Sequence, residues 1–111
     1  MLKVEKIRNV LVVSFSQENK LNVTVSQKIK LEITKLVTPH TKLVMNLEGI
    51  NYIDSTGFGM MLSILRTCKN NNSQLKFCNI APEVMELIKL LQLQTVFDIR
   101  GSVNECIDSF D

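Results

Sequence analysis

Hydrophobic residues along the chain follow two spacings, one typical of strands and one typical of helices. The runs 2–7 and 10–15 carry many β-branched residues and are joined too closely for a helical crossover, so they predict an antiparallel hairpin with 2–7 at the sheet edge. Apolar runs at 43–47, 75–80 and 95–99 predict three further strands.

Segments with helical spacing separate these strands. The pair Thr24 and Gln27 has the spacing of a capping box and predicts the start of a first helix, which Pro39 ends. A second helix is expected over 56–69, and a third from Pro82, a residue that suits the first helical position. The expected buried stripes are Val25, Ile29, Ile33, Leu36 and Val37, then Phe58, Met61, Leu62 and Leu65, then Val84, Leu87, Ile88 and Leu91.

A last short helix is expected from Ser102, which forms a second capping-box pair with Glu105, to a point near Phe110. The resulting order is ββαβαβαβα. Strands that alternate with helices favour a mostly parallel sheet covered by helices. The chain length suits one hydrophobic core. We therefore expect a single α/β domain over residues 1–111, with a mixed, mostly parallel sheet and an antiparallel edge strand.

The junction 52–57 between a buried strand and the second helix is the richest in chemistry. It holds Asp54, Ser55, Thr56 and Gly57. One interpretation is a helix cap, in which these side chains accept hydrogen bonds from the free amides of the first turn. The other is a regulated site, because ligands gather at the carboxyl ends of strands in open α/β sheets and a helix N-terminus favours a phosphate. Residue types alone leave both open.

Two further apolar residues of the second helix, Met60 and Ile64, lie one turn apart and outside its expected core stripe. They either pack against a neighbouring helix or form an exposed apolar strip beside the junction, where methionine adapts to a partner. Both interpretations stay open at this point.

Composition narrows the function classes. A formal net charge of +2 gives no indication of nucleic-acid binding, and no apolar run is long enough for a membrane span, so we expect a cytoplasmic protein. The cysteines Cys68, Cys78 and Cys106 form no metal-ligand spacing and are expected to be buried hydrophobic residues. Ser55 has no plausible basic partner, since His40 precedes the strand 43–47, so we expect neither a cofactor nor catalysis.

The order of residues in VMNLEGINYIDSTGFGMML closely resembles the signature of the STAS domain family, specifically the bacterial anti-sigma-factor antagonists. The matching motif is Asp54, Ser55, Thr56 and Gly57, followed by Gly59 in register. The resemblance covers nearly the full chain and implies the STAS fold. It also implies that Ser55 is phosphorylated by a partner serine kinase, which is itself the anti-sigma factor, and that a separate phosphatase removes the phosphate.

By the same resemblance, the unphosphorylated form binds the anti-sigma kinase, frees a sigma factor and so regulates transcription, and the unbound protein is a monomer. The residues expected at the partner interface are Asn22, Asp54, Ser55, Thr56, Gly57 and Met60. Two positions depart from the family pattern, Asn22 where aspartate is common and Gln92 where glycine is common. The competing hypothesis is a STAS subunit that is never phosphorylated and serves a lipid-transport complex or a stress-sensing assembly.

Overall fold

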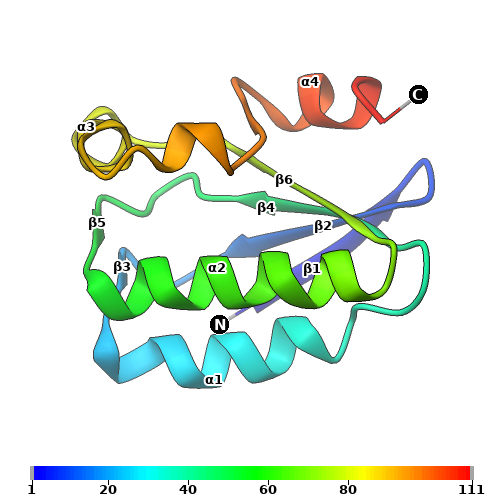
Figure 1. Ribbon diagram of the computed structural model, residues 1–111, viewed down its shortest axis with the longest axis horizontal. Helices are drawn as coiled ribbons and strands as arrows, with labels where there is room; N and C mark the ends of the chain where they lie inside the picture. Colours follow the sequence, from blue (N-terminus) through cyan, green and yellow to red (C-terminus); the bar gives the residue numbers. More distant parts are fainter. Residues whose placement is uncertain (1, 111) are drawn as a thin grey trace.

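The computed structural model describes residues 2–110 and is built on a five-stranded sheet (Figure 1). The strand order is β1-β2-β4-β6-β7. β1 pairs antiparallel with β2 at one edge, and every other neighbouring pair in this sheet is parallel. The strands are β1 (Leu2–Ile7), β2 (Val10–Phe15), β4 (Lys42–Asn46), β6 (Gln74–Cys78) and β7 (Ile99–Arg100). The predicted mixed sheet with an antiparallel edge strand is confirmed.

Helices cover both faces of this sheet, with the two long helices on one face and a short helix on the other. Figure 1 shows α1 and α2 lying side by side along one face and α4 along the opposite face. The helices are α1 (Val23–Thr34), α2 (Ser55–Asn70), α3 (Pro82–Leu90) and α4 (Val103–Asp108), with a 3₁₀ turn η1 (Leu93–Thr95). The larger core lies under α1, α2 and α3, and a smaller one lies under α4. Alternation along each strand divides the residues between these two cores, as in Leu43 and Val44.

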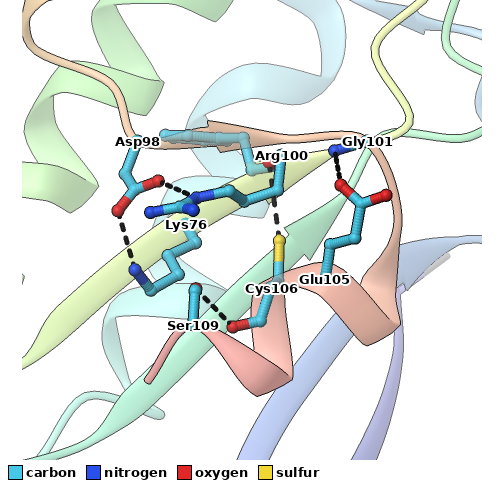
Figure 2. A network of polar contacts seen from close by, with 8 residues as sticks. Lys76, Asp98, Arg100, Gly101, Glu105, Cys106 and Ser109 are labelled. Atoms are coloured by element: carbon cyan, nitrogen blue, oxygen red, sulfur yellow. Dashed lines mark hydrogen bonds and ion pairs between the residues drawn. The ribbon is translucent and has the colours of Figure 1, made fainter. Parts of the chain in front are cut away.

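An ion pair between a buried lysine and a partly exposed aspartate lies on the α4 side of the sheet. The Lys76 ammonium lies 2.7 Å from Oδ2 of Asp98 and 4.8 Å from the centre of the Phe110 ring. Asp98 also accepts a hydrogen bond from Nε of Arg100 at 2.8 Å. Figure 2 shows Asp98 between the two cations, with Cys106 of α4 packed close by. Because the charge of buried Lys76 is paired, it does not carry the full cost of leaving water.

The first helix differs from the prediction at both ends. Its N-cap is Asn22, whose side chain accepts a hydrogen bond from the Thr24 amide, so the predicted capping box at Thr24 is wrong. The helix also ends at Thr34, well before Pro39. Val37 is nevertheless buried, because the chain beyond the helix keeps packing against the larger core.

Part of the apolar stripe expected on α2 and on α3 lies outside the core. Leu62 on α2, Leu87 on α3 and Leu91, the C-cap of α3, were expected in the core but are exposed, at 38%, 37% and 54%. The strand predicted at 95–99 is also wrong, because Thr95 belongs to η1 and the strand is the short β7. The three cysteines are free and buried, as predicted.

Candidate functional site

A two-stranded parallel sheet, separate from the main one, builds the site. It pairs β3 (Lys20–Leu21) with β5 (Tyr52–Ile53). The next residue after each strand is the N-cap of a helix, Asn22 for α1 and Asp54 for α2. Figure 1 shows the two helices starting at the same end of the molecule. Neither β3 nor β5 was predicted as a strand, because two residues are too few to establish a period.

Asp54 organises the first turn of α2. Its Oδ1 accepts hydrogen bonds from the backbone amides of Thr56 (2.9 Å) and Gly57 (3.1 Å), and from the Thr56 hydroxyl (2.5 Å). The hydroxyl bond is the largest cause of a lowered pKa for the Asp54 carboxyl, and the amides of Gly57, Thr56 and Val23 contribute in the same direction. Since Val23 is the first residue of α1, this carboxylate interacts with the starts of both helices. The predicted helix cap is therefore present.

Gly57 lets the two helix starts lie close together. A Cβ at this position would stand 2.4 Å from the backbone oxygen of Leu21 and 2.6 Å from Cγ2 of Ile53. Both neighbours belong to the small β3–β5 sheet. Gly57, expected at the partner interface, is thus in close contact with atoms of its own chain, and the fold needs a glycine there.

Ser55 is the first residue of α2 and is exposed. Among the described residues, no hydrogen bond holds its hydroxyl. The first turn of α2 contains no acidic side chain. Ser55 is thus an accessible hydroxyl next to the Asp54 carboxylate, at a helix start where the helix dipole favours an anion.

Asn22 and Thr56, two other residues expected at the partner interface, also lie here. The Ser26 hydroxyl donates to the backbone oxygen of Asn22 at 2.7 Å and lies 3.4 Å from Oγ1 of Thr56. Ser26 is buried and connects the first turns of α1 and α2. The sequence interpretation missed this residue, whose only signal was a serine within the first turn of a helix.

Met60 does not form the exposed strip considered from the sequence. Met60 and Ile64 are 3% and 0% exposed and belong to the larger core, so the interpretation that they pack internally is confirmed. Met60 still lines a hollow of about 280 Å³ between α1 and α2, together with Thr56. Its contribution to a partner interface would be limited to the floor of that hollow.

Residues 2–110 contain no cluster of three or more potential metal-ligating side chains among His, Cys, Asp and Glu. No helix in the same range is long and apolar enough to cross a membrane.

Comparison with curated proteins finds relatives at low identity. An anti-sigma-B factor antagonist of Staphylococcus aureus is 23% identical over 74 residues, which span 62% of this chain and 68% of that protein. A STAS-domain containing protein of Pseudomonas aeruginosa is 29% identical over 63 residues, which span 57% of this chain and 61% of that protein. The similarity to the latter thus covers less than two thirds of its length.

Solved structures show the same fold. An anti-sigma-factor antagonist (STAS) domain protein from Planctomyces limnophilus superposes with a TM-score of 0.89 at 17% identity, over 97% of this chain and 96% of that one. The phosphorylated form of the Bacillus cell fate determinant SpoIIAA gives a TM-score of 0.70 at 19% identity over both full chains. The murine anion transporter Slc26a9 gives a TM-score of 0.77 at 15% identity, over 93% of this chain and 18% of the transporter.

The STAS domain model matches residues 1–106 of the 111 in this sequence. With the sheet order, the paired helix starts and the motif at Asp54 now described, the chain belongs to the STAS domain family.

Proposed function

We propose that this chain is an anti-sigma-factor antagonist, a binding module switched by phosphorylation of Ser55. In its unphosphorylated form it binds an anti-sigma serine kinase and so releases a sigma factor for transcription. The kinase phosphorylates Ser55, and a phosphatase restores the binding form. The proposal assigns no catalytic step to this chain.

One observation carries the proposal: Ser55 is exposed at the first position of α2, directly after the capping Asp54. A kinase must reach the acceptor hydroxyl, and an exposed serine at a helix start meets that need. The neighbouring hydroxyl of Thr56 is less available, because it already donates to Asp54 and lies 3.4 Å from the Ser26 hydroxyl. This difference favours Ser55 over Thr56 as the acceptor.

The same geometry supports a large effect of a phosphate. Phosphorylation adds a charge of about −1.5 to −2, here next to the Asp54 carboxylate. The Asp54 carboxyl, whose pKa is lowered from an already acidic usual value, is ionised at neutral pH, so two negative groups would stand side by side. A partner that packs closely over the start of α2 would have to desolvate both, and binding would weaken.

The similarity to an anion-transporter STAS domain supports a second candidate, an accessory or scaffold subunit without phosphorylation. In that case Asp54 would only cap α2, and Ser55 would be an ordinary first-turn residue. The Staphylococcus relatives and SpoIIAA, all antagonists by name or structure title, favour the first candidate.

The test is intact-mass analysis of the protein purified from its own cells, with peptide mapping across residues 50–66. We expect an increment of about 80 Da on a fraction of the molecules, the mass of one phosphoryl group. The mapped segment contains three serine or threonine residues, Ser55, Thr56 and Ser63, and one tyrosine, Tyr52. The increment should disappear in Ser55→Ala and persist in the matched control Ser63→Ala.

A binding experiment completes the test. Tagged wild-type protein should retain an anti-sigma serine kinase from the same cells, and Ser55→Asp should retain much less of it. If Ser55 stays unmodified in every growth condition and Ser55→Asp binds the same partners as the wild type, the switch is excluded. The accessory-subunit hypothesis would then take its place.

A further inference from the structure

The exposed face of α2 presents a row of residues that starts at Ser55. Ser55, Gly59, Leu62, Arg66 and Lys69 follow one another at intervals of four and three residues, and all are exposed. This spacing places them on one side of a helix. We propose that this row, called the α2 ridge, docks an acidic surface of the anti-sigma kinase. The inference rests on the proposed function and adds to it the docking surface and the charge of the partner.

Gly59 is the first indication of close docking. A Cβ at this position would meet no atom within 4 Å, and its backbone is not in the left-handed region. The fold therefore gives no reason for a glycine here, although glycine weakens the interior of a helix. A partner backbone that approaches α2 closely would require it. Gly57 is different, because atoms of the chain itself surround it.

Leu62 and its surroundings supply an apolar anchor. Leu62 is 38% exposed, although its spacing is that of a core residue. It borders a hollow of about 260 Å³, whose other lining residues are Leu65, Arg66, Lys69 and Asn70. An apolar hollow rimmed by polar groups is the usual form of a contact point for a partner side chain.

The charges along the ridge fit an acidic partner. The sequence of α2 contains Arg66 and Lys69 but no aspartate or glutamate. The hollow on the α1 side of the ridge has Lys30 as its only charged lining residue. Positive groups that face a partner attract a negative surface and speed its docking.

A second copy of this chain is a poorer occupant. In a two-fold contact the same patch meets itself, so Arg66 and Lys69 of both copies would come together without acidic groups on α2 to neutralise them.

Phosphorylation of Ser55 would oppose the attraction between the α2 ridge and an acidic partner. It adds a charge of about −1.5 to −2 at the head of a positive row, in a chain whose formal net charge is +2. An acidic partner attracted by Arg66 and Lys69 would then be repelled at Ser55.

The first test uses charge reversal with a matched control. The probe is the purified anti-sigma serine kinase that the wild-type protein retains. We expect Arg66→Glu/Lys69→Glu to lower its affinity about tenfold or more, mainly at low salt. The control Lys6→Glu/Lys35→Glu makes the same change in net charge at two exposed positions outside α2, and its affinity should stay within about twofold of the wild type. Equal losses in both variants, or no loss in the first, would overturn the inference.

The second test uses Gly59→Ala, for which stability and binding should move in opposite directions. We expect a higher melting temperature, because alanine favours the helix and meets no clash. We also expect about a tenfold weaker affinity for the same kinase, because the added methyl group blocks close approach. Unchanged kinase binding by Gly59→Ala would contradict the close docking.

Failure of the inference can be told apart from failure of the proposed function. If the wild type binds the kinase, Ser55→Asp does not, and the ridge variants bind normally, only the docking surface is wrong. If no anti-sigma kinase binds the wild type, both the proposed function and the proposed docking surface are wrong. If the ridge variants form a different oligomer from the wild type in sedimentation experiments, the ridge is a contact between copies, and the acidic partner is excluded.

Discussion

The first turns of α2 and α4 are both capped by side chains, but the capping residues differ. At α4, the Ser102 hydroxyl accepts a hydrogen bond from the Glu105 amide at 3.1 Å, and Oε2 of Glu105 accepts one from the Gly101 amide at 3.0 Å. The carboxylate of α4 therefore comes from inside its own first turn. At α2, the carboxylate is the cap itself, Asp54, and the first helical residue is the exposed Ser55.

This difference determines which helix start offers a hydroxyl for phosphorylation. Glu105 already places a negative group at the start of α4, where the helix dipole favours one. At α2 the cap Asp54 supplies the carboxylate, and the first turn also holds the exposed hydroxyl of Ser55, to which a further negative group can be added by modification. Both starts are capped, but only α2 combines its cap with an exposed acceptor. Capping chemistry alone, then, does not identify a regulated site.

Disturbing the packing that positions the start of α2 should lower the stability of the protein most. In Gly57→Ala, the new Cβ would press against the backbone oxygen of Leu21, which cannot move away as a flexible side chain can. We expect the free energy of unfolding to fall by about 3 kcal/mol, the upper part of the range for overpacking. Urea denaturation followed by circular dichroism measures this change.

The matched control is Gly59→Ala, two residues further along the same helix. It should raise the free energy of unfolding by about 1 kcal/mol, because alanine is the better helix former and the site is open. If both glycine variants are equally stable, the close contact of Gly57 with Leu21 does not hold in solution.

Much of this arrangement was predictable from the sequence, and the part that was not has a physical cause. The main strands and the helix at 56–69 were found because long apolar runs carry a clear period. The motif at Asp54 and Ser55 identified the position of the site. β3 and β5 were missed because each has two residues, and with them the reason why Asn22 lies beside Asp54.

Side-chain exposure was predicted less well than the elements themselves. Leu62 and Leu91 were expected in the core from helical spacing, but a stripe shows which face of a helix is apolar and not how far its neighbours cover it. Met60 was left undecided for the same reason and proved to be buried. The pairing of a buried lysine with Asp98 also had no local signal, since Lys76 and Asp98 are far apart in sequence.

Removing the cap of each helix separates the structural role of a cap from a role in function. Asp54→Ala and Ser102→Ala each delete the side chain that accepts first-turn amides, and each should lower the free energy of unfolding by about 1 kcal/mol. Thermal unfolding measures both. Only Asp54→Ala should also reduce phosphorylation of Ser55 and binding of the anti-sigma kinase. If Ser102→Ala reduces kinase binding as much, the effect comes from lost stability, and the two helix starts do not differ in function.

A smaller change is expected from the hydrogen bond between the Thr56 hydroxyl and Asp54, which lowers the pKa of the α2 cap. The Thr56 hydroxyl is the main cause of the lowered pKa of Asp54, so Thr56→Val should raise that pKa toward its usual value of 3.8, and Thr56→Ser should leave it low. Because the pKa of Asp54 is lower in the folded state, the stabilising effect of its ionised form is complete above about pH 4. It is lost as the pH falls through the folded pKa. In Thr56→Val the folded and unfolded pKa values of Asp54 lie closer together, so this contribution should be smaller and its loss should be complete at a higher pH. A ¹³C NMR titration of the Asp54 carboxyl measures the shift. An equal pKa in the valine and serine variants would show that the amides alone hold the charge, and the start of α2 would then resemble that of α4 more closely than its hydrogen bonds indicate.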